Sequence, residues 1–138
     1  MRILGLDVGT KTVGVACSDA LRITAQGVET IRRKSWEQDL NRIEELVREK
    51  EVHAIVLGMP KHMNGDKGAN AEMVEDFKAR LEAKMPELEY VYWDERLSTA
   101  MAQRQLIEAN VRRDKRKQVI DKMAAVVILQ GYLDAKTN

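Results

Sequence analysis

Four acidic side chains stand at positions where a carboxylate is costly unless a positive group meets it. Asp7 ends an apolar, strand-forming run near the N-terminus, Asp94 and Glu95 follow a later strand, and Asp121 lies near the start of the last helix. Acids that converge at one sheet edge repel one another, and a divalent cation removes that repulsion. Because every ligand would be oxygen, Mg²⁺ or Mn²⁺ is favoured over zinc. Two such ions about 4 Å apart are a known arrangement for phosphodiester hydrolysis.

Each acid also has a purely structural interpretation. Asp7 could cap backbone N–H groups in the glycine turn that follows it. Asp94 and Glu95 could both be solvated loop acids, and composition does not choose between them. If the strand geometry persists that far, only one of the two can point into a given site, because consecutive side chains of a strand point to opposite faces.

Asp121 is the most informative acid, because its neighbours on the same helix face are small or apolar: Ala124, Ala125 and Ile128. A carboxylate on the inward face of a buried helix needs a positive partner. We expect Asp121 in the first turn of its helix, where the alternative is a favourable but modest interaction with the helix N-terminus.

Positive charge is concentrated just before Asp121. The segment from Val111 to Lys122 holds six of the 23 Lys/Arg residues and two of the 22 Asp/Glu residues, a local charge of +4 that leaves −3 for the remainder of the chain. A flexible basic strip beside an acidic metal site suits a protein that holds a phosphate backbone. A solvated loop between helices is the alternative. The strip's cations are Arg112, Arg113, Lys115, Arg116 and Lys117.

Composition indicates one soluble globular domain, residues 1–138. The chain is 44% apolar and 33% charged with a net charge of +1, so no partner class follows from the overall charge. The lone Cys17 excludes a disulfide within the chain and favours a core position in a protein of the reducing cytosol. The sequence indicates neither a signal peptide nor a membrane span. His53 and His62 lack metal-ligand spacing, and we expect both at the surface.

Hydrophobic periodicity predicts five strands and four helices. Three strands come in succession, and the two later strands are each reached through a helix. The strands are predicted over 3–7, 12–16, 23–31, 54–59 and 89–93. The first helix is predicted to be capped by Ser35 and to bury Trp36, Leu40, Ile43, Leu46 and Val47. A loop is predicted over 62–70. The second helix buries Val74, Phe77 and Leu81 and ends before Pro86. The third helix is predicted over 97–109 and the last over about 118–135, with a connector over 111–117 between them.

This order predicts an α/β fold with a mixed five-stranded sheet. The first three strands form an antiparallel meander, the last two add parallel strands through right-handed crossovers, and helices cover both faces. Reactive crevices in such sheets lie beyond the carboxyl ends of the parallel strands. Asp7, Gly58 and Glu95 are all expected at such ends.

Four blocks of sequence, in order, resemble the YqgF family of pre-16S ribosomal RNA nucleases, Holliday-junction-resolvase-like members of the ribonuclease H superfamily. The blocks span almost the whole chain: Gly5–Lys11 with Val13–Ala16, Gly58–Pro60 with its glycine loop, Asp94–Thr99, and Ile120–Lys122 with Ala124, Ala125 and Ile128–Gln130. The resemblance implies a ribonuclease H-like nuclease domain whose catalytic and metal-binding triad is Asp7, Glu95 and Asp121, with Glu95 chosen over Asp94. It implies Mg²⁺ or Mn²⁺ as cofactor and maturation of the 16S rRNA 5′ end as the task.

Two further expectations accompany the resemblance. Ordinary ribonuclease H and resolvase sites place an acid where this chain has Gly58, and we infer that the glycine leaves room for Glu95. Lys11, Arg96 and the basic strip would position the nucleic-acid backbone. We expect precursor rRNA as partner, with branched DNA open, no membrane contact, and a monomer or weak homodimer in the cytoplasm.

Three alternatives remain open from the sequence. A Holliday junction resolvase would use the same chemistry but needs paired cuts, hence a dimer. An actin-like ATPase or sugar kinase also opens with a strand that ends in Asp-x-Gly-Thr, but needs two such domains around a nucleotide. A catalytically weak RNA-binding or transcription-associated factor would use the same surface without turnover. Cleavage of four-way DNA against precursor RNA, with the mass in solution, separates the first from the leading hypothesis.

Overall fold

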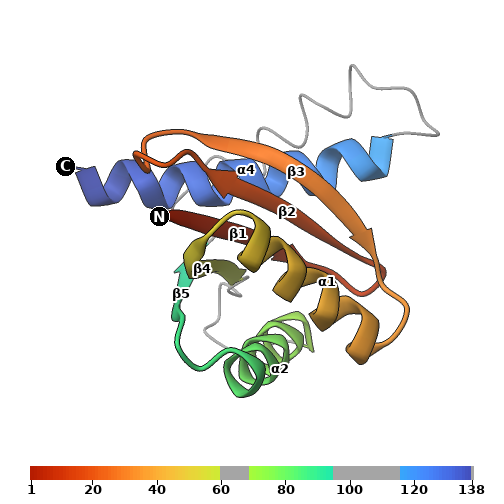
Figure 1. The fold of residues 1–138 in the computed structure, drawn as a ribbon. Helices are drawn as coiled ribbons and strands as arrows, with labels where there is room; N and C mark the ends of the chain where they lie inside the picture. The colour runs from red at the N-terminus through yellow and green to blue at the C-terminus, as the bar shows by residue number, and fades with distance from the viewer. Residues whose placement is uncertain (60–68, 95–115, 138) are drawn as a thin grey trace.

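The fold is built around a single mixed sheet (Figure 1). The computed structural model describes residues 1–59, 69–94 and 116–137, with side chains for 1–59, 71–94 and 123–136. The sheet contains five strands in the order β3-β2-β1-β4-β5. β1 pairs antiparallel with β2 and β2 with β3, whereas β1–β4 and β4–β5 are parallel. The predicted meander followed by two parallel strands is therefore confirmed.

The five strands match the predicted ones, with shifted ends. They are β1 (Arg2–Val8), β2 (Thr12–Ser18), β3 (Ala25–Arg32), β4 (Val52–Met59) and β5 (Glu89–Asp94). β3 begins later than position 23 because the Asp19 carboxylate accepts the N–H groups of Ile23 and Thr24, at 2.7 and 3.1 Å, and holds them in a turn. The register between β2 and β3 shifts between Val15 and Ala16, where Ala16 pairs with Gly27.

Three helices lie in the described part of the chain: α1 (Trp36–Glu49), α2 (Ala69–Lys84) and α4 (Arg116–Thr137). Ser35 caps α1 as predicted, since its side chain accepts the Gln38 N–H at 3.2 Å. α2 begins two residues inside the expected loop over 62–70, whose other residues lie outside the described part. The expected helix over 97–109 also lies outside it.

α4 begins before its predicted start. Its first residue is Arg116, inside the predicted connector, so Asp121 lies in the second turn and not the first. The partial positive charge of a helix N-terminus acts mainly within the first turn. The structural interpretation of Asp121 as a partner of that terminus is therefore weakened. The prediction that Asp121 lies in the first turn was wrong, because α4 begins two residues before its predicted start.

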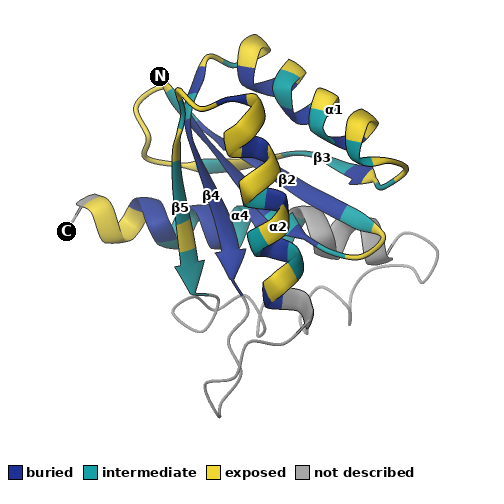
Figure 2. Ribbon diagram, turned by 90° about the horizontal axis from the view of Figure 1, so that it is seen from below, coloured by how far each residue is buried: buried dark blue, intermediate teal, exposed yellow. Residues whose placement is uncertain are grey.

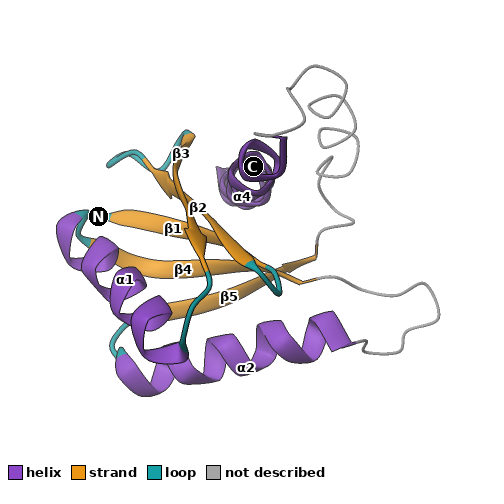
Figure 3. Ribbon diagram, turned by 90° about the vertical axis from the view of Figure 1, so that its right-hand side faces the viewer, coloured by secondary structure: helices purple, strands orange, loops and turns teal. Residues whose placement is uncertain are grey.

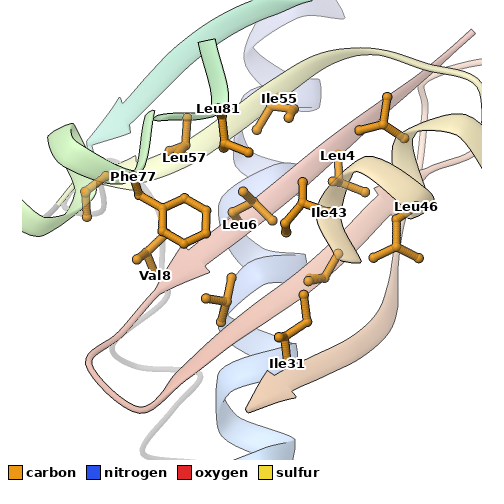
Figure 4. Close-up of a cluster of buried hydrophobic side chains, with 14 of the residues drawn as sticks. Leu4, Leu6, Val8, Ile31, Ile43, Leu46, Ile55, Leu57, Phe77 and Leu81 are labelled. Carbon is orange, nitrogen blue, oxygen red and sulfur yellow. The ribbon is translucent and has the colours of Figure 1, made fainter. Parts of the chain in front are cut away.

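The helices cover both faces of the sheet (Figure 3). α1 and α2 pack on one face, where they share a core with Leu4, Leu6 and Val8 of β1 (Figure 4). α4 packs on the other face, where it is the one helix of the described part of the chain, against a second cluster that includes Ile3 and Val56. Figure 2 shows both helices of the first face with one buried side toward the sheet and one exposed side. β1 and β4 are almost wholly buried because they are central and covered on both faces.

Cys17 is a buried free cysteine, as predicted. Burial raises the pKa of its thiol, and the positive charges of Lys50 and Arg2 oppose that shift. A thiol that is harder to ionise is a poor nucleophile, so Cys17 serves the core. None of the helices in the described part of the chain is long and apolar enough to cross a membrane.

Tyr90 on β5 closes the C-terminal end of α2, and this contact predicts a pH effect. Its hydroxyl donates to the carbonyls of Leu81 and Met85 at 3.0 and 2.8 Å. Burial, with the charges of Glu87 and Glu82, raises the pKa of Tyr90 to about 12. Tyrosine in the unfolded chain ionises near 10. Below pH 10 the Tyr90 hydroxyl is protonated in both the folded and the unfolded chain, so it does not change the free energy of unfolding. As the pH rises from 10 to 12 the free energy of unfolding falls, because the unfolded state releases the proton first.

The Tyr90→Phe variant should lack that decline. Partial exposure reduces the expected difference in unfolding free energy between pH 9 and pH 11.5 to about 1 kcal/mol. Urea unfolding of both proteins at the two pH values, with tyrosinate absorbance to follow ionisation, measures the difference. Parallel pH profiles for the two proteins would show that Tyr90 does not carry the effect.

Candidate catalytic edge of the sheet

Asp7 stands on the face of the sheet that α4 covers. Along β1 the side chains of Leu4, Leu6 and Val8 enter the core under α1 and α2. Ile3 and the Cα of Gly5 face α4, and strand alternation puts Asp7 on that same side. Asp7 is half-buried and pairs with Gly14 of β2. Because β1 extends to Val8, Asp7 is its penultimate residue and not its last, which ties the carboxylate to the rigid sheet.

α4 packs closely on β1 at Gly5. A Cβ built on this glycine would lie 2.8 Å from Cβ of Leu129 and 3.3 Å from the carbonyl oxygen of Ala125. The N-terminal end of β1 lies by the C-terminal part of α4, since Ile3 lines a common cavity with Leu133 and Lys136. α4 therefore runs antiparallel to β1, and moving along β1 toward Asp7 means moving along α4 toward its first turns.

This geometry sets the direction in which residue 121 lies. The Gly5 contact falls between Ala125 and Leu129, so residue 121 lies about 6 to 12 Å farther toward the N-terminus of α4, and Asp7 lies about 6.6 Å farther along β1 in the same direction. Position 121 of α4 and Asp7 of β1 therefore lie on the same side of the sheet and toward the same end of it. The predicted convergence of these two acids is consistent with the backbone, while the Asp121 side chain lies outside the described residues.

Gly58 lies beside Asp7. The parallel register pairs Leu6 with Leu57, so the next residues along the two strands are Asp7 and Gly58. On its other side Gly58 pairs with Trp93 of β5. Trp93 packs toward α4, with its ring centroid 6.1 Å from that of Tyr132. The glycine thus leaves a position without a side chain between Asp7 and β5, on the face that α4 covers.

Asp94 points to the other face. Lys78 of α2 lies 5.2 Å from the ring centroid of Tyr92, which shows that Tyr92 faces α2. Because side chains two residues apart in a strand point to the same face, Asp94 lies on the face of Tyr92, which is opposite the face of Asp7. Of the two acids that the sequence left open, Asp94 does not share the face of Asp7. Glu95 and Arg96 lie outside the described residues, so their assignments stay predictions.

Arg33 fixes the turn that follows Asp7, a role that sequence reasoning missed. Its guanidinium donates to the carbonyl of Gly9 at 3.0 Å, and its backbone N–H donates to the carbonyl of Lys11 at 2.8 Å. The same guanidinium pairs with the buried Asp39 of α1 at 3.4 Å and lies 4.7 Å from the ring centroid of Trp36. The signal in the sequence was Asp39 itself, an acid on the buried side of an amphipathic helix that requires a cation.

The other predicted residues are placed less completely. Lys11 is exposed in the turn between β1 and β2, where it is free to meet solvent or a phosphate. Arg116 and Lys117 belong to the first turn of α4, with side chains outside the described part, and Arg112, Arg113 and Lys115 lie wholly outside it. The expectation of a surface position was wrong for His53, which is half-buried with a buried Nδ1. His62 is outside the described residues.

The donors that fit a divalent cation here are carboxylate oxygens. Within the described side chains no three of His, Cys, Asp and Glu are grouped closely enough to hold a metal ion. Of the predicted triad only Asp7 belongs to that set. What the described part contributes is a half-buried carboxylate on a rigid strand, a glycine beside it and the backbone of residue 121 toward the same end of the sheet. This donor chemistry suits Mg²⁺ or Mn²⁺.

Comparison with known proteins places the chain among nucleases. The RuvX family model, described as Holliday junction resolvase, matches residues 1–135. A "Putative pre-16S rRNA nuclease" of Bacillus mycoides is 59% identical over 138 residues, which cover 99% of this chain and 100% of that protein. A protein of the same name from Halalkalibacterium halodurans is 58% identical over 136 residues, with 97% and 96% covered.

The fold likeness extends to a solved resolvase. The structure "T. thermophilus RuvC in complex with Holliday junction substrate" aligns with a TM-score of 0.64 at 10% identity, over 99% of this chain and 96% of that one. At this identity the likeness concerns the fold, and the predicted ribonuclease H-like, resolvase-like architecture is confirmed. The expected resemblance to pre-16S rRNA nucleases is confirmed as well.

Proposed function

The chain belongs to the RuvX family, and from this premise we propose that it is a divalent-metal-dependent nuclease that hydrolyses RNA. The substrate we propose is precursor 16S rRNA, cut in maturation of its 5′ end in the cytoplasm. The names of full-length relatives at 58–59% identity support the substrate class. The observation that carries the chemistry is Asp7, half-buried on the α4 side of β1, toward the same end of the sheet as residue 121 of α4.

The proposed metal site joins three elements. Asp7 supplies a carboxylate from β1, Asp121 supplies one from α4, and Glu95 supplies one directly after β5. Bound Mg²⁺ or Mn²⁺ would lower the pKa of a coordinated water and neutralise charge on the phosphate. The three carboxylates would hold the metal ions and would not themselves attack phosphorus.

The cations around this edge would orient the backbone of the substrate. Lys11 is exposed in the turn after Asp7 and would contact a phosphate of the substrate. Arg33 holds that turn through the Gly9 carbonyl and would fix where Lys11 emerges. Arg96 and the basic strip would supply further phosphate contacts, which set position and not sequence preference.

A Holliday junction resolvase is the second candidate, and the description of the matching family model favours it specifically. Both functions need the same metal chemistry, but a resolvase must also place two sites on one four-way junction and therefore act as a dimer. The RNA assignment needs no dimer. The catalytically weak binding factor differs from both in having no turnover.

One assay separates these functions. The purified chain is incubated with precursor 16S rRNA, an unrelated single-stranded RNA and a four-way DNA junction, each with Mg²⁺, Mn²⁺ or excess EDTA, and its mass is measured in solution. Our proposal predicts cation-dependent cleavage of the precursor in preference to the junction. Symmetrical cleavage of the four-way junction by a dimer would contradict the RNA nuclease assignment and support the resolvase assignment. Binding of the precursor without cleavage under any cation would support the binding factor.

A further inference from the structure

A cavity of about 350 Å³ lies at the opposite end of the sheet from Asp7. It is bounded by the beginnings of β1, β4 and β5, by the loop before β3 and by the last turns of α4. Ile3, on its wall, is four residues before Asp7, or about 13 Å along the strand. The contact of Gly5 with Leu129 lies between the two regions.

The polar side chains of this cavity are mostly basic. Arg22, His53 and Lys136 line it together with a single acid, Glu89. Within the described part of the chain, no ion pair involves Arg22, Lys136 or Glu89. The Lys136 ammonium instead lies 5.6 Å from the ring centroid of Tyr132, which also lines the cavity. The cationic groups are thus available to an anion.

His53 has a buried ring atom without a partner. Its Nδ1 is shielded from solvent and makes no hydrogen bond. Unpaired buried polar atoms are rare in native structures and call for an explanation. Protonation of Nδ1 would bury a donor without an acceptor, so the ring is best accommodated with its proton on Nε2. In that tautomer Nε2–H is the donor available to a ligand.

The wall that carries Arg22 is held in place without a ligand. Arg22 has a φ of 60°, a left-handed conformation, and its N–H donates to the Asp19 carbonyl at 3.0 Å. Gln130 of α4 fastens the loop from the other side, since it donates to the Ile23 carbonyl and accepts the Ala25 N–H, both at 2.9 Å. The loop therefore presents Arg22 from a fixed backbone, and binding need not order it.

We propose that this cavity binds a nucleoside monophosphate. Arg22, Lys136 and the Nε2–H of His53 supply donors for a phosphate, and Glu89 can accept hydrogen bonds from ribose hydroxyl groups. The apolar wall, formed by Ile3, Leu21, Ala54, Tyr132 and Leu133, suits the base. The volume falls within the range of small-molecule sites, about 300–1,000 Å³. The site is separate from the catalytic edge and does not depend on the proposed nuclease activity.

The test uses the full chain and four probes, AMP, GMP, CMP and UMP, with inorganic phosphate and the matching nucleosides for comparison. Calorimetry measures affinity, and NMR follows the ring signals of His53, which a His53→Gln variant assigns. We expect at least one nucleotide to bind with Kd below 1 mM and to shift the His53 signals. Its nucleoside and free phosphate should each bind at least tenfold more weakly.

Variants locate the site. Arg22→Asn keeps a residue type that tolerates a left-handed φ, and Lys136→Met keeps the length of the side chain, so both should fold. Together they should weaken binding at least tenfold, whereas Arg48→Met, at a side chain 77% exposed on α1, should not. Asp7→Asn should leave binding unchanged, which distinguishes this cavity from product binding at the catalytic edge. Absence of binding at 10 mM, equal affinity for phosphate alone, or unchanged affinity in the double variant would overturn the proposal.

Discussion

The Asp7→Asn variant should lose RNA cleavage by a factor of at least about 10³, equivalent to about 4 kcal/mol of transition-state stabilisation. Asparagine keeps the size of the side chain and can still accept a hydrogen bond, but it removes the negative charge that would hold a divalent cation. Asp7 is half-buried on a central strand, so no neighbouring side chain can easily take its place. Initial rates on precursor rRNA in saturating Mg²⁺ measure the loss.

An exposed acid provides the matched control. Asp76 of α2 lies on the other side of the sheet and is 52% exposed, so Asp76→Asn should cleave at the wild-type rate. Circular dichroism should show both variants folded. A folded Asp7→Asn protein that retained wild-type cleavage would exclude Asp7 as a metal ligand, provided that the activity purifies with the chain.

Replacing Gly58 with leucine should remove metal-dependent cleavage to the same degree while the fold persists. Gly58 lies beside Asp7 on β4 and pairs with Trp93 on β5, all on the α4 side of the sheet. A leucine side chain would stand between Asp7 and the end of β5, in the space that we propose Glu95 needs. Leucine is no worse than glycine for a strand backbone, so unfolding is not the expected cause of the loss.

The adjacent Met59 supplies the control for Gly58. Met59 belongs to the core on the opposite face, so Met59→Leu changes a neighbouring side chain without entering the proposed site. This volume-conserving change should cost less than about 1.5 kcal/mol of stability and leave the rate unaltered. Rates and urea unfolding are measured for both variants. Full activity in Gly58→Leu would show that the glycine does not make room for a ligand.

Most of the sheet could be predicted because its signals are local. Apolar runs over β1 and β4, the glycine turn after β1 and the Ser35 cap of α1 each reflect interactions within a few residues. The predicted starts of β3 and α4 differ from the observed ones. The Asp19 carboxylate delays β3, and nothing in the basic run at 111–117 indicated that α4 would begin at Arg116.

The parts that could not be predicted depend on contacts distant in sequence. Arg33 supports the turn beside Asp7 through the carbonyl of Gly9, 24 residues away in the sequence, and is itself held by Asp39 and Trp36 of α1. Asp94 is excluded from the face of Asp7 by the contact of Tyr92 with Lys78 of α2 and by the packing of Trp93 on Tyr132 of α4. The position of residue 121 toward the Asp7 end of the sheet follows from the packing of Leu129 on Gly5 and from the antiparallel course of α4. Sequence periodicity carries no information on how far a helix slides along a strand.

The most direct test of the shared metal site is the anomalous scattering of Mn²⁺ in crystals of the wild-type chain. We predict manganese bonded to the Asp7 carboxylate, with Glu95 and Asp121 completing the carboxylate ligands and with Gly58 beside the site. The account would be contradicted by carboxylates of residues 7, 95 and 121 that point into separate regions of solvent, with no manganese between β1 and α4.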